Sequence, residues 1–176
     1  GFLMPQVIDS TSLGLSFELP YYKVLSDNKD LTFTPRIFSE NEGLFQNEYR
    51  QVNENSKHIA DFSLKEKNSS SKTHFFSNSI AKLEIDTFDI SEIELNVELT
   101  SDDNYLKTHN ISSSINENQS LLESFLLFRG NSRDMDFETK IEAYEDLSKD
   151  KSSDKYEYIF PSYEFSKRIT SSYDGD

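Results

Sequence analysis

The sequence of 176 residues contains no cysteine, which excludes disulfide frameworks, thiolate metal sites and cysteine nucleophiles. Glycine and proline are scarce, at five and four residues, whereas a sandwich of short strands usually has Gly- and Pro-rich turns. No apolar run approaches the roughly 20 residues that a membrane helix requires. A helical membrane protein is therefore excluded, but a membrane β-barrel is not, because its strands show only alternation.

Basic side chains are also few. The chain has 18 Lys and Arg against 32 Asp and Glu, which gives a formal net charge of −14. A surface of this sign repels the phosphate backbone of a nucleic acid. We therefore expect no nucleic-acid partner.

Aromatic side chains are abundant in a chain that is otherwise polar. Only 35% of the residues are hydrophobic and 28% are charged, figures that are typical of disorder. The 14 Phe and 9 Tyr residues argue against disorder, because most of them lie at alternate positions of β-prone segments. A sheet with one apolar face and one solvent-exposed polar face explains both the low hydrophobic content and the many aromatic residues.

Alternation with a period of two recurs along the chain and predicts β-strands. The clearest case is "IELNVEL", in which Ile93, Leu95, Val97 and Leu99 alternate with polar residues; a helix would scatter these positions around its whole surface. A weaker segment lies near residues 106–115, and a polar loop is expected at 67–72. The expected strands cover residues 13–22, 31–37, 44–52, 57–65, 75–87, 93–99, 121–129, 135–144 and 156–167.

The pattern predicts an all-β fold, an antiparallel up-and-down meander of about eight or nine long strands. Strands of globular proteins average about five to six residues, whereas a tilted membrane-spanning strand needs about nine to eleven. The strands expected here match the longer class. We interpret the chain as a segment of a large outer-membrane β-barrel, either an open curved sheet or a partial barrel. The alternative is a soluble or surface-exposed β-sandwich that binds a ligand or partner.

The sequence contains no recognisable set of catalytic or metal-binding residues. His58, His74 and His109 lie on different segments without the spacing of metal ligands, and there is no P-loop, GxSxG or GxGxxG motif. We therefore expect no enzyme activity, no metal and no cofactor. A carbohydrate hydrolase built on paired carboxylates is a weaker third alternative.

Acidic side chains gather on one expected face. Glu84 and Asp86 are expected on one strand and Glu92, Glu94 and Glu98 on the next, as neighbouring stripes of one polar surface. Repulsion between these carboxylates is tolerable in water or with bridging cations. The stripe is either simply a wet face, or the lining of a wide pore through which divalent cations or sugar groups pass.

Several motifs resemble those of a known family. "GFLMPQ" is followed by "LGLSFELPYYKVLSDNKDLTFTPRIFSENEGLFQNEYR", which contains a "PYY" strand, an "NxDLTxTPR" strand and an "EYR" strand. Further on, "TSDDNYLKTHNIS" is similar to a "SDDxYLRxYxI" segment. Together they resemble the start of the β-barrel in the LptD family, the lipopolysaccharide-assembly proteins once called organic solvent tolerance proteins. The resemblance is most specific in the forty residues after Leu13 and thins beyond about Asn116.

The resemblance implies a barrel in the outer membrane of a Gram-negative bacterium that inserts lipopolysaccharide into the outer leaflet. In the family a periplasmic jellyroll receives lipopolysaccharide from an LptA-type bridge, and an LptE-type lipoprotein plugs the barrel. The implied partners are therefore lipopolysaccharide, these two proteins and outer-membrane lipid. The absence of cysteine departs from members whose jellyroll and barrel are joined by disulfides.

The resemblance also implies a division of the chain. Residues 1–12 are expected to be a lead-in from a missing periplasmic domain, 13–168 barrel strands and 169–176 a truncated tail. "GFLMPQ" lacks the basic region and cleavage site of a signal peptide, and a chain that opens without Met is expected to be a piece of something longer. By itself such a piece is not expected to transport anything.

Two prolines lie in the motifs of the first two strands, where proline removes a hydrogen-bond donor. The resemblance places Pro20 and Pro35 near the seam between the first and last strands, as one side of a lateral gate. If the apolar residues of the two strands share a face, Pro20 lies opposite Thr34 or Arg36 and never opposite Pro35. One proline then weakens the ladder between the two strands and the other weakens an outer ladder. Protection of a free edge against mispairing is the alternative.

Overall fold

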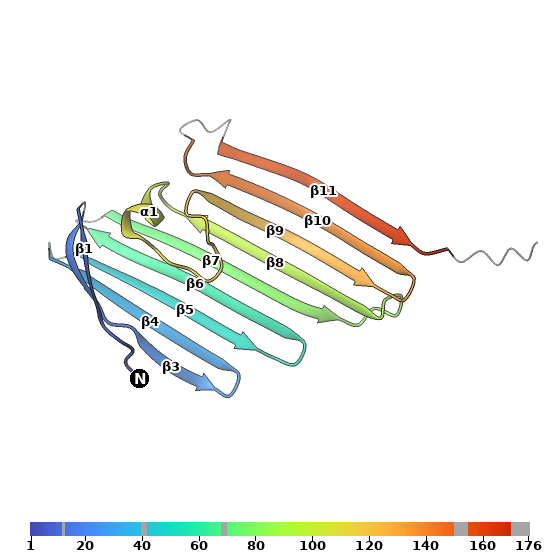
Figure 1. Ribbon diagram of the computed structural model, residues 1–176, viewed down its shortest axis with the longest axis horizontal. Helices are drawn as coiled ribbons and strands as arrows, with labels where there is room; N and C mark the ends of the chain where they lie inside the picture. The colour runs from blue at the N-terminus through green and yellow to red at the C-terminus, as the bar shows by residue number, and fades with distance from the viewer. Residues whose placement is uncertain (12, 40–41, 68–69, 150–154, 170–176) are drawn as a thin grey trace, which may run out of the picture.

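The computed structural model describes residues 1–11, 13–39, 42–67, 70–149 and 155–169. Eleven strands form one antiparallel sheet in the order β1-β2-β4-β5-β6-β7-β8-β9-β10-β11, and β3 pairs with β4 (Figure 1). The elements are β1 (Gln6–Ser10), β2 (Gly14–Glu18), β3 (Tyr21–Ser26), β4 (Lys29–Phe38), β5 (Gly43–Val52), β6 (Ser56–Lys67), β7 (Ser70–Leu83), β8 (Ile90–Thr100), α1 (Tyr105–His109), β9 (Leu121–Asn131), β10 (Met135–Asp146) and β11 (Tyr156–Lys167).

The sheet is a single open layer whose two edges lie apart (Figure 1). From β4 onward each strand pairs with the next one along the chain, which is an up-and-down meander. Within the described ranges β1 and β11 do not pair with one another, and no second sheet packs on this one. The predicted all-β fold and open meander are therefore confirmed, and the sandwich alternative finds no support.

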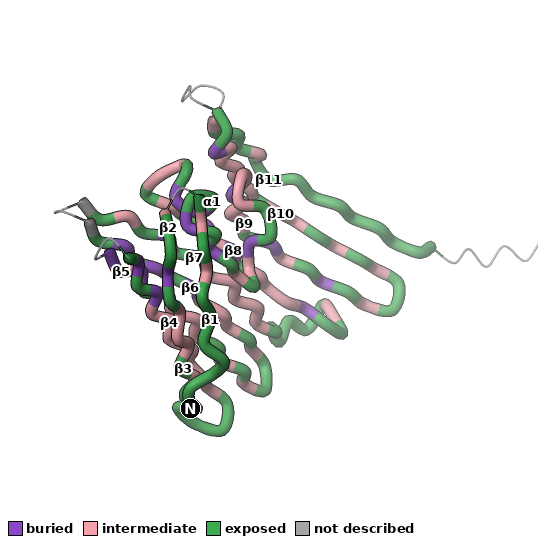
Figure 2. The backbone as a smooth tube through the Cα atoms, turned by 60° about the vertical axis from the view of Figure 1, so that its left-hand side comes forward, coloured by how far each residue is buried: buried purple, intermediate pink, exposed green. Residues whose placement is uncertain are grey.

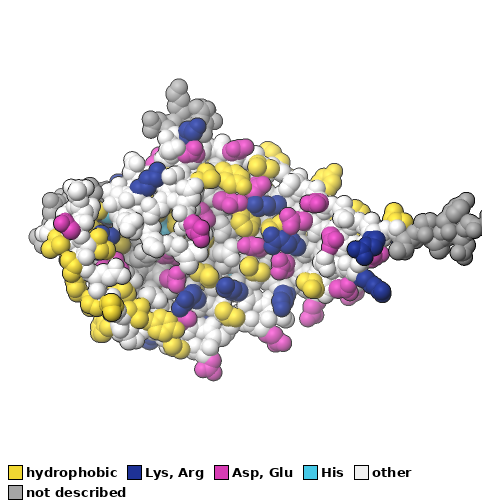
Figure 3. All heavy atoms as spheres, viewed as in Figure 1, with side chains coloured by type: hydrophobic (Ala, Val, Ile, Leu, Met, Phe, Trp, Pro, Cys, Tyr) yellow, Lys and Arg dark blue, Asp and Glu magenta, His cyan; other side chains and the backbone are white. Residues whose placement is uncertain are grey.

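The two faces of the sheet differ in chemistry because cross-strand partners project to the same side. The face that carries α1, called the inner face here, has Lys, Arg, Asp and Glu side chains interspersed over it (Figure 3). On the opposite, outer face Phe62 pairs with Phe75, and the rings of Phe33 and Phe45 stack 6.1 Å apart. Many outer-face side chains are exposed, among them Phe17, Phe45, Phe62, Phe75, Leu95, Leu99, Leu126, Ile141 and Phe165.

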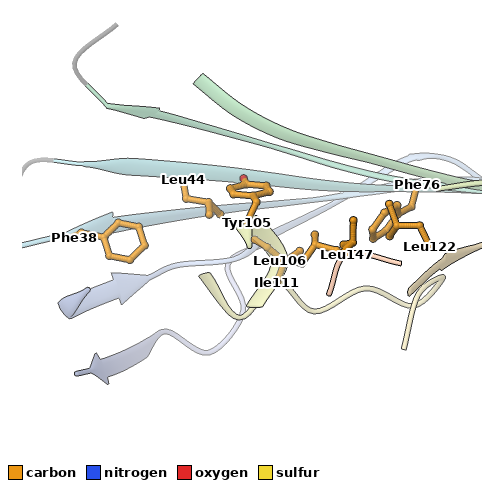
Figure 4. Close-up of a cluster of buried hydrophobic side chains, with 8 residues drawn as sticks. All are labelled: Phe38, Leu44, Phe76, Tyr105, Leu106, Ile111, Leu122 and Leu147. Atoms are coloured by element: carbon orange, nitrogen blue, oxygen red, sulfur yellow. The ribbon is translucent and has the colours of Figure 1, made fainter. Parts of the chain in front are cut away.

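The hydrophobic core is small and lies where α1 and the chain after it cover one end of the inner face. Figure 4 shows its eight side chains: Phe38, Leu44, Phe76, Tyr105, Leu106, Ile111, Leu122 and Leu147. Full burial of such a side chain contributes about 1.5–3 kcal/mol. The connection between β8 and β9 contributes three of the eight residues, Tyr105, Leu106 and Ile111, and therefore stabilises this end of the sheet.

The expected strand at 13–22 is interrupted in the structure. β2 ends at Glu18 and β3 begins at Tyr21. Between them the Leu19 N–H donates to the Pro35 carbonyl, but Pro35 has no N–H to return a bond, so the ladder with β4 is incomplete there. The register is unchanged across the break, since Glu18 pairs with Arg36 before it and Tyr21 with Phe33 after it. The break therefore interrupts the strand without a bulge.

Two other expected segments differ in the structure. The strand expected to reach residue 87 ends at Leu83, and β7 begins at Ser70, so part of the polar stretch 67–72 is strand. The weaker segment near 106–115 forms α1 and an irregular stretch, because Asn110 adopts the left-handed conformation (φ 48°) that ends the helix. Residues 1–12, expected to be a lead-in, contain β1. Of the expected tail at 169–176, all but Ile169 lies outside the described residues.

In the part of the chain that the structure describes, no helix has the length and apolar character needed to cross a membrane.

Leu106 tests the contribution of the small core. Its side chain is 1% exposed, so Leu106→Ala should lower the free energy of unfolding by about 2–5 kcal/mol. Urea unfolding of the detergent-folded protein measures the loss. Leu95→Ala, on the outer face and 46% exposed, is the matched control and should change the midpoint little. Equal losses for the two variants would contradict this assignment of the core.

Candidate functional site

The predicted acidic stripe divides into two parts. The register of β7 and β8 places Glu92, Glu94 and Glu98 on the inner face, with Glu94 opposite Ile80. Glu84 and Asp86 do not lie on a strand, because β7 ends at Leu83, and both are exposed in the turn before β8. The expectation that they form a parallel stripe on the neighbouring strand is therefore wrong.

Two of the three strand carboxylates share one cation. Arg129 on β9 lies 3.2 Å from Glu92 and 3.5 Å from Glu94, and its Nε donates to Glu138 on β10 at 3.0 Å. Lys140 forms a similar pair with Glu123 at 2.9 Å on the same face. Repulsion between Glu92 and Glu94 is thus reduced by Arg129 on the adjacent strand. In the described residues no group of three or more His, Asp or Glu side chains is placed to hold a metal ion.

The third carboxylate holds the connection between β8 and β9. Glu98 is 5% exposed and accepts hydrogen bonds from the side chains of Asn96, at 3.1 Å, and Asn116, at 2.5 Å, and from the backbone N–H of Glu123, at 3.0 Å. Donors on three segments thus compensate the burial of its charge. Glu98 is therefore a structural residue and does not line an open surface.

A buried polar cluster lies between the inner face and α1. Ser63 Oγ is 2.6 Å from His74 Nδ1 and 2.7 Å from the Tyr105 hydroxyl, and His74 Nε2 is 3.4 Å from Asp61 Oδ1. Gln46 donates to both carboxylate oxygens of Asp61. All but Gln46 are buried, and Ser63 is in contact with Tyr105 of α1. Ser63, His74 and Asp61 are the residue types of a serine–histidine–aspartate catalytic triad. They are buried, however, and Ser63 bonds the Tyr105 hydroxyl, so the cluster is a docking site for α1.

The C-terminal end of α1 is held by cations. Lys65 Nζ lies 2.7 Å from both His109 Nε2 and a Glu42 carboxylate oxygen, and Arg36 Nη1 donates to the His109 carbonyl at 2.7 Å. His109 Nδ1 lies 2.9 Å from the carbonyl of Tyr105. Burial lowers the pKa of His109 and the positive charges of Lys65, Lys72 and Arg36 lower it further, against the opposing effect of the Tyr105 bond. A neutral His109 therefore donates through Nδ1 and accepts through Nε2.

The buried contacts of Ser63, His74, Tyr105 and His109 were not predicted from the sequence. Ser63 and His74 lie on neighbouring strands, and Tyr105 and His109 lie on a segment that carries no alternation. The signal available in the sequence was a pair of polar residues on the wet face of β6 next to a histidine on β7. The helix that covers them was not predicted, so their burial could not be foreseen.

The two prolines remove hydrogen-bond donors on opposite sides of the strand formed by β2 and β3. The Leu19 N–H donates to the Pro35 carbonyl at 3.1 Å, and the Leu3 N–H donates to the Pro20 carbonyl at 2.8 Å. In an antiparallel ladder a bonded pair exchanges two hydrogen bonds, so each proline leaves its pair with one. Pro35 weakens the ladder between β2 and β4, and Pro20 weakens the bonds on the outer edge. The register places Thr34 opposite Pro20, and a role for the prolines in a gate stays a prediction.

An open antiparallel meander of long strands, with one apolar and one ion-paired face, is consistent with a segment of a β-barrel wall. No protein-family model matches the chain. Over 109 residues, or 60% of the chain, the sequence is 32% identical to the LPS-assembly protein LptD of Pseudoalteromonas atlantica (strain T6c / ATCC BAA-1087). The match covers 14% of the length of that protein. This gives the resemblance to the LptD family partial support.

His109 gives the docking of α1 a dependence on pH. Its folded pKa lies below the ordinary value of 6.5, so the unfolded chain binds the proton first as the pH falls. The contribution of His109 to stability is complete above that value and is lost as the pH falls below it.

Hydrogen exchange of the α1 amides should therefore speed up between about pH 7.5 and about pH 5.5, after correction for the intrinsic rate. His109→Gln keeps an acceptor for Lys65 but does not titrate, and should remove this dependence. The same pH dependence in both proteins would show that another group is responsible.

Proposed function

We propose that this chain is part of an outer-membrane wall that inserts lipopolysaccharide into the outer leaflet, with β2, β3 and β4 forming one side of a lateral gate. The proposal depends chiefly on the similarity to LptD over 109 residues, in a chain folded as an open sheet of long strands. The wall acts mechanically and carries out no chemistry of its own.

The outer face supports contact with lipid. Phe62 and Phe75 are directly paired there, yet each remains more than 40% exposed, as do Leu95 and Leu99 on β8. Contiguous exposed apolar surface of this kind marks an interaction site in a water-soluble protein. In a bilayer the same side chains meet acyl chains, and β4 to β11, at 10 to 14 residues each, are long enough to cross it when tilted.

The inner face supports contact with water and sugars. Arg129 and Lys140 each lie among carboxylates, so these two cations are already paired and less able to hold a phosphate group tightly. Such a surface offers hydrogen bonds to hydrated sugars without a strong fixed binding site. This is the property required of a wall past which a large glycolipid must slide.

The lengths of the connections suggest an orientation. The turns after β3, β5 and β9 are short, whereas the connections at the other end include residues 101–120 and 147–155. Outer-membrane barrels have short periplasmic turns and longer extracellular loops. The end that carries α1 would accordingly face the exterior, and the LptA-type bridge and the LptE-type plug would meet other parts of the whole protein.

Arginine substitutions test which face meets lipid. Leu95→Arg places a charge on the outer face, where insertion should cost about 2–4 kcal/mol near the membrane midplane. Ile80→Arg, on the inner face opposite Glu94, is the matched control and should insert normally. Folding into lipid vesicles, followed by heat-modifiable migration, measures insertion. Normal insertion of the Leu95 variant with failure of the Ile80 variant would reverse the assignment of the faces.

The gate is tested by giving back the missing donors. In the full-length protein, Pro20→Ala should restore a bond at the seam and Pro35→Ala a bond in the ladder to β4. Together they should slow the arrival of lipopolysaccharide at the outer leaflet, since each added bond contributes about 0.5–1.5 kcal/mol in water and more in hydrocarbon. Pro161→Ala in β11 is the control for loss of a proline elsewhere in the wall. Unchanged export in the double variant would count against a gate at these positions.

A further inference from the structure

Residues 1–10, called the strap here, run along the outer edge of β2 and β3. Figure 2 shows β1 and the N-terminal residues lying beside β2 and β3 and exposed along most of their length. β1 pairs with β2 over five residues, from Gln6 opposite Glu18 to Ser10 opposite Gly14. Phe2 forms a bridge with Tyr21 further along the same edge. The strap therefore covers the edge that the proposed function assigns to the gate.

The strap is attached mainly through its backbone. The Leu3 N–H donates to the Pro20 carbonyl at 2.8 Å, and the Tyr22 N–H donates to the Gly1 carbonyl at 2.9 Å. Side chains add a bond from Ser16 Oγ to the Ile8 carbonyl at 3.1 Å and an edge-to-face contact between Phe2 and Tyr21. These are the interactions that an added strand makes when it extends a sheet.

The strap has no anchor in the core. None of its side chains is buried, and Phe2, Met4 and Val7 are 71%, 83% and 69% exposed. Its middle is interrupted, because Met4 and Pro5 lie between the two bonded stretches and Pro20 offers no N–H to the Leu3 carbonyl. By contrast β6, inside the wall, pairs on both sides and carries the buried Asp61 and Ser63. Loss of the strap would uncover an edge without opening the core.

We propose that the strap is an exchangeable strand, held on the edge of β2 and β3 until the closing strand of the wall displaces it. The proposal rests on the proposed function, because that function makes this edge one side of the gate. The occupant that replaces the strap is one extended antiparallel strand, apolar on the lipid side, where it would take the place of Val7 beside Phe17. The missing donor of Pro20 makes this exchange easier, because it removes a bond that the strap would otherwise have to break.

A disulfide can fix the strap in place. Val7 and Phe17 are cross-strand partners on the outer face. The backbone groups of Leu15 and Leu19 hydrogen-bond toward β4, so the even-numbered residues of β2 hydrogen-bond to the strap. Val7 and Phe17 are therefore a non-hydrogen-bonded pair, whose Cα atoms lie closer together and suit a disulfide. These 176 residues contain no cysteine, so Val7→Cys with Phe17→Cys introduces the only thiols in this part of the protein.

Phe62→Cys with Phe75→Cys is the matched control, an outer-face pair between two strands that stay together in the proposal. Both variants are made in the full-length protein in its own outer membrane and assayed for lipopolysaccharide arrival at the outer leaflet, oxidised and after reduction. Oxidation should nearly abolish export in the strap variant, because a covalent disulfide then holds the strap on the edge that the closing strand must occupy. Reduction should restore it, and the control should export normally in both states.

Two results would overturn the strap proposal. One is normal export with the strap disulfide formed, and the other is failure of the strap cysteines to cross-link while the control pair does. Neither result affects the proposed function, since export itself continues. Absence of lipopolysaccharide export by the unmodified protein would instead refute the proposed function.

Discussion

The whole structure depends on the rule that cross-strand partners project to the same face of a sheet. The register runs from β4 to β8 without a shift. The face on which the odd-numbered residues of β4 lie therefore fixes which residues of the next four strands meet water. Phe33, Phe45, Phe62, Phe75 and Leu95 follow from it on one face. A slip of one residue anywhere would exchange the two surfaces.

This rule explains how much the sequence could predict. The strands and the faces of Ile93 to Leu99 follow from alternation, and the antiparallel order follows from the short links between strands. Alternation also predicts that Pro20 lies opposite Thr34 or Arg36 and never opposite Pro35, and the register places it opposite Thr34. The break between β2 and β3 was not predicted, because the alternation continues through it, and the two prolines indicated missing donors without showing that the strand would stop there. Glu84 and Asp86 were misplaced for a similar reason: alternation at 83–86 persists beyond the point where pairing stops.

The inner side of the wall could not be predicted because its contacts are distant in sequence. Ser63 meets Tyr105 across 42 positions and Lys65 meets His109 across 44, and α1, at five residues, is too short to show a helical period. The inner face is thus covered by α1 at one end, where side chains are buried, and is exposed to solvent over the rest. The buried cluster stabilises the covered end, while the paired charges of Arg129 and Lys140 keep the open part hydrated.

The central claim is that the apolar side chains of the outer face, which alternate with polar ones along each strand, contact lipid. Single cysteines at 93 through 99, each carrying a spin label, can be compared for collision with oxygen, which concentrates in the bilayer, and with a water-soluble nickel complex. The account predicts a period of two, with Ile93, Leu95, Val97 and Leu99 favouring oxygen and the positions between them not. Equal access of the nickel complex to both sets of positions in the membrane-inserted protein would contradict it.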